Sequence, residues 1–102
     1  MSNSGSVRRS VAHFRLGRWF VTSGARAKLV GQSITDAFNR HAKGDFGNVC
    51  EEDFDANLDA IAEGLHIVSS YRCDNNQGST SKVYVITEAD RSMTTLLLAP
   101  EY

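Results

Sequence analysis

His41 and Asp45 are the first pair of residues in this chain whose types and spacing could do chemistry together. A carboxylate can orient an imidazole for acid–base work, and the two stand four residues apart. Gly44 lies between them and favours a helix end, so the alternative is a helix C-terminal histidine followed by a glycine-rich turn. The turn is the favoured interpretation, and a small hydrolase centred on His41 and Asp45 stays as one of three functional hypotheses.

Two charged groups could receive a protein partner. One is a stripe of carboxylates that recur every four residues along one side of a predicted helix, and the other is a predicted hairpin tip. Each also has an ordinary structural interpretation, as a solvated helix face and as turn chemistry with a surface ion pair. The stripe is Asp55, Asp59 and Glu63, and the tip holds Glu88, Asp90 and Arg91.

A third set is basic and could contact nucleic acid. Trp19 and Phe20 stand among these cations and could stack on bases, although the same alternation is typical of a half-buried strand. The hypothesis requires the cations to converge on one face, and the formal net charge of −1 weighs against it. The set is Arg15, Arg18, Arg26, Lys28, Arg40 and Lys43.

Metal and cofactor chemistry finds no support in the sequence. Cys50 and Cys73 are isolated cysteines, and the three histidines add no ligand spacing typical of zinc. We therefore predict no metal, no cofactor and no catalytic residue, and we expect both thiols to be unpaired.

The charges are divided unevenly along the chain. Residues 1–43 contain eight Lys or Arg and one acid, whereas residues 44–102 contain three Lys or Arg and eleven acids. Such a division can steer encounters, pair one copy with another or join the two halves within one fold.

The elements that position these residues follow from periodicity and turn chemistry. We expect a strand over residues 14–22, helices over 24–30 and 34–43, and a third helix from residue 51 to a stop at Gly64. Strands are predicted over residues 65–72, 82–87 and 93–98, with a polar loop over 73–81 and a hairpin link over 88–92.

This order predicts an α+β fold, with an antiparallel sheet of three to four strands packed against about three helices on one face. Residues 1–12 are rich in Ser, Gly and Asn and are predicted to form a flexible arm, leaving residues 13–102 as one domain. The longest apolar run, residues 96–99, is far below the ~20 residues needed to cross a bilayer. With no secretion signal at the N-terminus, we expect a cytoplasmic protein with no membrane partner.

Three motifs together carry a family resemblance. They are residues 41–47 (HAKGDFG), residues 63–64 (EG) leading to 69–72 (SSYR), and residues 85–98 (VITEADRSMTTLLL) with a terminal PEY. Over residues 16–102 the chain resembles a family of small bacterial proteins carried by plasmids, integrative elements and integron gene cassettes. The resemblance implies a mobile-element accessory protein and transfers no catalytic residue.

The leading hypothesis is a non-enzymatic protein-interaction module, an adaptor or an inhibitor, with an anti-defence role in view. Its partner would be a protein that the sequence does not identify, and self-association into a homodimer is expected from the opposed charges and a free sheet edge. Nucleic-acid binding through the basic half is the alternative, and the small hydrolase is the second alternative.

Overall fold

The computed structural model describes residues 14–49 and 51–102. The predicted arm over residues 1–12 and Cys50 lie outside the described residues. In chain order the elements are β1 (Arg18–Val21), α2 (Ser23–Lys28), α3 (Gly31–Ala42), α4 (Glu51–Glu63), β2 (Ile67–Asp74), β3 (Thr80–Thr87), β4 (Met93–Leu98) and the short 3-10 turn η1 (Ala99–Glu101). The α+β class is confirmed.

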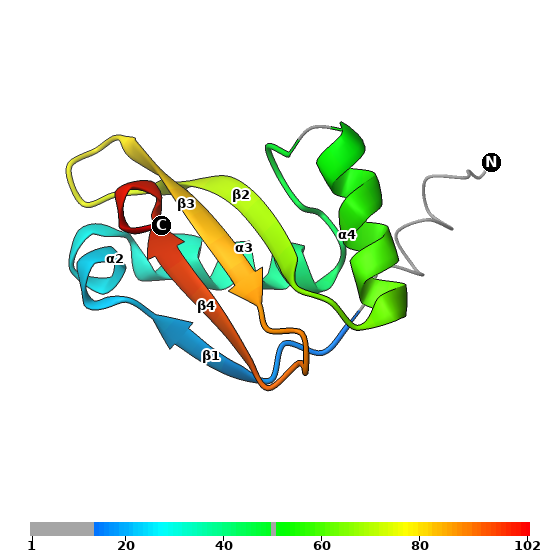
Figure 1. The fold of residues 1–102 in the computed structure, drawn as a ribbon. Coiled ribbons are helices and arrows are strands. Elements are labelled where there is room, and N and C mark those ends of the chain that lie inside the picture. Colours follow the sequence, from blue (N-terminus) through cyan, green and yellow to red (C-terminus); the bar gives the residue numbers. More distant parts are fainter. Residues whose placement is uncertain (1–13, 50) are drawn as a thin grey trace.

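The four strands form one sheet in the order β1-β4-β3-β2 (Figure 1). The neighbours β2, β3 and β4 are antiparallel, and the β3–β4 hairpin forms where the sequence predicts it. The first strand departs from the prediction, because β1 pairs with β4 in parallel, with Arg18 beside Met93 and Val21 beside Leu96. The sheet is therefore mixed and not wholly antiparallel.

Gly17 explains where β1 begins. Its φ of +65° lies in the left-handed region, and a Cβ at this position would stand 2.4 Å from the carbonyl oxygens of Arg91 and Ser92. A glycine is needed here for the chain to pass so close to the hairpin tip. The strand therefore starts at Arg18 and is shorter than the predicted span of 14–22.

Strand pairing divides the sheet into two faces. The inner face carries Val83, Val85 and Leu96, which are fully buried and pack against Phe38 of α3. Because successive side chains alternate, the opposite face carries Phe20, Tyr84, Ile86 and Leu97. We call this second side the open face.

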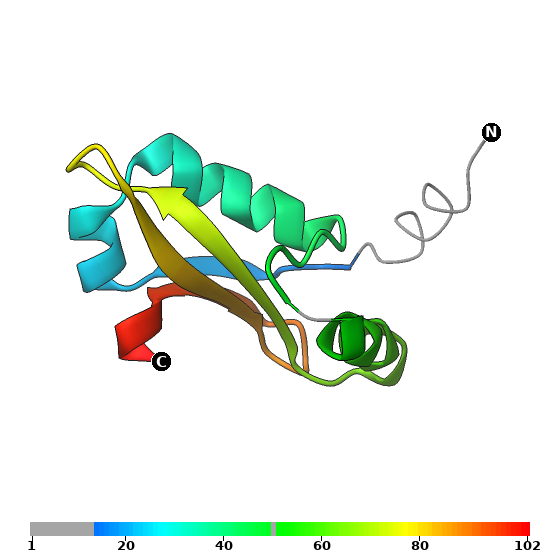
Figure 2. The same ribbon diagram turned by 90° about the horizontal axis from the view of Figure 1, so that it is seen from above.

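The helices do not all cover the same side (Figure 2). The long helix α3 lies across the inner face, whereas α4 stands beside β2 at one end of the sheet and builds a smaller core with Phe46 and Ile67. In the view of Figure 2, η1 lies on the side of the sheet opposite α3. The prediction that the helices share one face therefore holds for α3 and not for α4.

Several element ends differ from the predicted ones. Thr22 caps α2 through its hydroxyl, and α3 begins at Gly31, three residues before the predicted start, with no side-chain cap. The predicted loop over residues 73–81 shrinks because β2 and β3 extend to Asp74 and Thr80, where the side chain of Asn75 accepts from main-chain N–H groups of the turn. Extra ladder bonds outweigh the polar composition of this segment.

Within residues 14–49 and 51–102, no helix combines the length and the apolar character needed to cross a membrane.

Candidate functional site

The structure does not bring the two residues of the hydrolase hypothesis together. His41 is fully buried, and its two ring nitrogens contact hydroxyl groups: Nδ1 that of Ser69, and Nε2 that of Thr87 at 2.8 Å. The carboxylate of Asp45 instead forms a bidentate pair with Arg40, at 2.7 and 3.2 Å, on the exposed surface. No carboxylate of the described residues orients the imidazole.

His41 lies in a chain of hydroxyl groups whose direction can be deduced. Thr94 donates its single proton to the carbonyl of Leu16 at 2.7 Å, so the 2.7 Å contact between Thr87 and Thr94 has Thr87 as its donor. Thr87 then accepts from His41 Nε2–H, and Nδ1 accepts from Ser69. His41 is the neutral Nε2–H tautomer with both nitrogens satisfied.

The surroundings of His41 also oppose its charged form. Burial lowers the pKa of His41 to about 3, since charging the ring removes a cation from water. Phe14 presents its ring edge-on to the imidazole, with centroids 5.1 Å apart. The imidazole is neutral and buried, and both of its nitrogens are hydrogen-bonded. It therefore fixes the packing of α3 on three strands and is poorly suited to proton transfer with a substrate.

The residues of the predicted hairpin tip form contacts within the fold. Arg91 adopts φ +61°, and its guanidinium donates to the carbonyls of Leu65 and Ala60 at 2.7 and 3.0 Å, which holds the C-terminal end of α4 against the tip. Asp90 accepts from the main-chain N–H of Ser92, and its hydrogen bonds with Ser92 hold its pKa below the ordinary value. Glu88 stands 3.4 Å from His66. Arg91 is therefore engaged inside the fold, unlike the free cation that a partner site needs.

The acidic stripe lies on the surface as predicted. Asp55, Asp59 and Glu63 are exposed on α4. The buried centre of this helix is Asn57 with Ala60, flanked by partly buried apolar side chains, whereas Leu65, just past the end of the helix, is 52% exposed. Within the described residues, no three His, Cys, Asp or Glu side chains come together as a metal site.

The basic set does not converge on one face. Arg26 and Lys28 are on α2, which packs near the end of β4, whereas Arg18 stands beside the start of β4. Six strand residues separate these ends by ~20 Å. Arg40 is paired with Asp45. The remaining members, Arg15 and Lys43, are exposed.

The two edges of the sheet differ more than the sequence indicates. Along the β2 edge, Asn57 bonds both main-chain groups of Val68, at 2.7 and 3.1 Å. At the next outward position, the main chain of Ser70 forms hydrogen bonds with the main chain of Phe46 and Asn48. The main chain of Asp74 forms hydrogen bonds with Ser33 of α3 and with Val30, the residue that precedes α3. Side chains and a loop thus cover most of this edge.

No described residue covers the β1 edge. Along β1 the main-chain groups point alternately toward β4 and away from it. Those of Arg18, Phe20 and Thr22 bond β4, so those of Trp19 and Val21 face outward. No described residue accepts from or donates to them on that side, and Figure 1 places β1 along the border of the molecule. Trp19 and Phe20 are 48% and 41% exposed. The alternation of aromatic and charged residues signals a strand here, but not that it would be an edge.

Neither the family models nor the curated proteins nor the solved structures contain a match to this chain.

Proposed function

We propose that this protein is a non-enzymatic interaction module that works through the free edge of β1, and that the strand docked there is β1 of a second copy. The observation that carries the proposal is the contrast between the edges. Side chains and a loop cover most of β2, whereas no described residue bonds the outward main-chain groups of Trp19 and Val21, which flank the exposed Phe20. An unpaired strand edge is a template for another strand.

The outward groups of β1 favour one antiparallel register. If Trp19 of each copy stands opposite Val21 of the other, their main-chain N–H and C=O groups form reciprocal pairs about a two-fold axis. Phe20 then faces Phe20 of the second copy on the open face, in the closer type of cross-strand pair. The strand is therefore complementary to itself.

Charge supports the same register. Arg18 would stand opposite Thr22 of the second copy, and the Thr22 hydroxyl donates to Glu101 at 2.8 Å. The guanidinium of Arg18, which lies 5.5 Å from the centroid of the Phe20 ring on the open face, then meets a carboxylate of the other copy. An opposite charge on each side of the axis favours a second copy over an unrelated strand.

The nucleic-acid and hydrolase hypotheses stay predictions, and the geometry supports them less. His41 and Asp45 are separately engaged, and the basic residues are spread over both ends of the sheet. The mobile-element and anti-defence roles stay predictions, and so does a further protein partner for the acidic stripe on α4.

Molecular mass in solution tests the proposal. A strand pair this short with one aromatic contact belongs to the weak class of interfaces, below about 1,200 Å², so we expect a dimer that dissociates on dilution. Phe20→Lys places two ammonium groups opposite each other and should give a monomer at every concentration. Leu65→Lys, at a side chain 52% exposed away from β1, is the matched control and should dimerise as the unmodified chain does.

The charge pair has its own test. Arg18→Gln and Glu101→Gln should each weaken dimerisation about threefold, because an exposed ion pair contributes up to ~1 kcal/mol, and the double variant should be no weaker than either single one. An unmodified chain that is monomeric at millimolar concentration, or an equal loss of dimer with Leu65→Lys, would rule out the β1 interface.

A further inference from the structure

A notch forms at the place where β3 extends past β4. The ladder between them ends at the pair Val83 and Leu98, yet β3 begins at Thr80 and stays paired with β2 along that stretch. The chain leaves the sheet after Leu98 because η1 turns away, with Pro100 in its first turn. One side of β3 therefore has no neighbouring strand near its start.

The pleat directs main-chain groups into this notch. On β2 the outward bonds belong to even-numbered positions such as Val68 and Asp74, so the odd-numbered ones bond β3. On β3 the groups of Tyr84 and Ile86 then face β4, and those of Lys82, two residues earlier, face the position that β4 has vacated. The main chain of Lys82 thus lies on the side of β3 that faces the notch.

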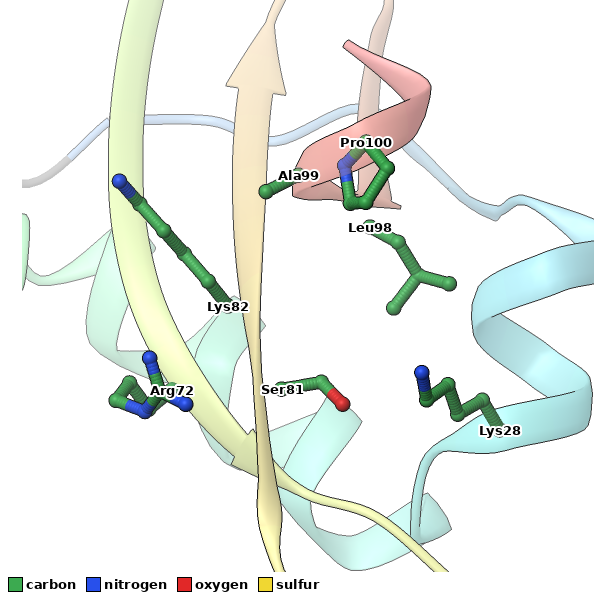
Figure 3. A pocket seen from close by; sticks show the side chains of 7 residues that line it. All are labelled: Lys28, Arg72, Ser81, Lys82, Leu98, Ala99 and Pro100. Atoms are coloured by element: carbon green, nitrogen blue, oxygen red, sulfur yellow. The ribbon is translucent and has the colours of Figure 1, made fainter.

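The notch holds an open pocket of about 300 Å³ (Figure 3). Its lining combines three cations, one hydroxyl group and an apolar wall, and it contains no carboxylate. Lys28 reaches in from the end of α2 and points toward Ser81 and Leu98, while Arg72 and Lys82 stand on the opposite side. The lining residues are Lys28, Arg72, Ser81, Lys82, Leu98, Ala99 and Pro100.

None of the three cations forms an ion pair within the part of the chain that is described. This distinguishes all three from Arg40, which is paired with Asp45, and the two lysines from Arg91, whose guanidinium donates to carbonyls. Arg72 uses Nε and Nη2 on Thr80, which leaves Nη1 for another acceptor. Like charges around one cavity repel, so a bound anion would relieve a cost that the empty site carries.

We propose that this notch binds a small phosphate monoester that carries an apolar or aromatic group. A phosphate monoester carries about two negative charges at pH 7 and strong acceptor oxygens, which suits three cations better than a single carboxylate does. Ser81 accepts from Asn75 at 3.0 Å, so its own O–H can donate to a phosphate oxygen. The apolar part of the ester would lie against Leu98 and Pro100.

Titration of the labelled full chain with phenyl phosphate, followed by amide chemical shifts, tests the proposal. We expect the largest shifts at Ser81, Lys82 and Ala99. Lys28→Met and Lys82→Met should each weaken binding about threefold, as expected for exposed charge pairs, and together about tenfold. Lys43→Met, which removes an exposed lysine just after α3, should leave the affinity unchanged.

Two further probes separate the parts of the site. Methyl phosphate keeps the charge and loses the ring, so it should bind about tenfold more weakly, because the apolar wall is no longer covered. Benzoate keeps the ring and halves the charge, and it should also bind more weakly. Equal affinity for benzoate would overturn the phosphate assignment. Shifts spread over the whole basic surface, or an equal loss with Lys43→Met, would overturn the site itself.

Discussion

The imidazole of His41 donates through Nε2 to the hydroxyl of Thr87, 2.8 Å away, in the fully buried interior between α3 and the sheet. This bond joins the C-terminal half of α3 to the end of β3. A histidine that sequence reasoning singles out for chemistry is thereby a polar residue that determines packing.

Stability should depend on pH through His41. Burial lowers its pKa to about 3 in the folded protein, against an ordinary value of 6.5. Between these values the unfolded chain binds a proton that the folded chain does not, so unfolding becomes easier as the pH falls. The free energy of unfolding should decrease below pH 6.5 by up to about 1.4 kcal/mol per pH unit from this group.

Urea unfolding at several pH values between 7.5 and 4.5 measures this slope. His41→Gln should remove most of it, whereas His66→Gln should retain it, because the His66 side chain is 62% exposed beside Glu88. An unchanged slope in His41→Gln would assign the pH dependence to other groups.

Removing one hydroxyl should destabilise the hydroxyl chain. Thr87→Val keeps the shape of the side chain but leaves the Nε2–H group of His41 without an acceptor, and an unsatisfied buried donor costs about 1–3 kcal/mol. Thr95→Val makes the same chemical change at a partly buried position on the open face. Thermal unfolding should show a large loss for the first variant and little change for the second. Equal effects would mean that the chain of hydroxyl groups adds no stability.

Two glycines separate backbone strain from steric contact. Gly47 and Gly64 have nearly the same φ, +72° and +71°, but a Cβ at Gly47 would stand 2.0 Å from the carbonyl oxygen of Ser70, and at Gly64 it would meet nothing within 4 Å. Gly64→Ala should cost ~1–2 kcal/mol, the cost of a left-handed conformation alone. Gly47→Ala should cost about 3 kcal/mol or more, because the loop that covers the β2 edge must move. Denaturant titration compares the two directly, and similar costs would contradict the close approach of this loop.

The end of α4 should need the planar guanidinium group of Arg91. Arg91→Lys keeps the charge but cannot reach both Ala60 and Leu65 with a forked group, so the end of α4 should open locally. Amide hydrogen exchange at Gly64 and Leu65 should become faster, with a loss of ~1–2 kcal/mol in stability. Arg26→Lys on the exposed side of α2 is the matched control and should leave these amides unaffected. Protection that persists in Arg91→Lys would show that other contacts hold α4.

The sequence predicts the elements that local chemistry determines. The carboxylates in the first turn of α4, the turn residues of the β3–β4 link and the resulting α+β class all depend on neighbours in the chain. What the sequence leaves open depends on distant partners. The parallel pairing of β1 with β4 requires Gly17 to pass beside Ser92. The role of Arg91 depends on carbonyl groups 26 and 31 residues away in the chain. Periodicity contains no information on such contacts.

The candidate surfaces show the same limit. The exposure of the acidic stripe follows from helical spacing, and the structure agrees. The free edge of β1 and the notch beside Lys82 arise from where strands end relative to one another, and strand ends are set by cross-strand pairing. Lys28 and Arg72 are 44 positions apart in the chain and line one cavity because two unrelated segments stop at the same end of the sheet.

The parallel pairing of β1 with β4 also determines the stage of folding at which the sheet can be completed. Arg18 pairs with Met93, so β1 has no place in the sheet until β4 has been synthesised. Closing so long a loop costs more conformational entropy than closing the β3–β4 hairpin, so we expect β1 to pair late in folding. Two copies at this stage can exchange their first strands, each β1 completing the sheet of the other chain, which is the route to a domain-swapped dimer. Slow refolding at high protein concentration should therefore favour an exchanged form, and dilution before refolding should suppress it.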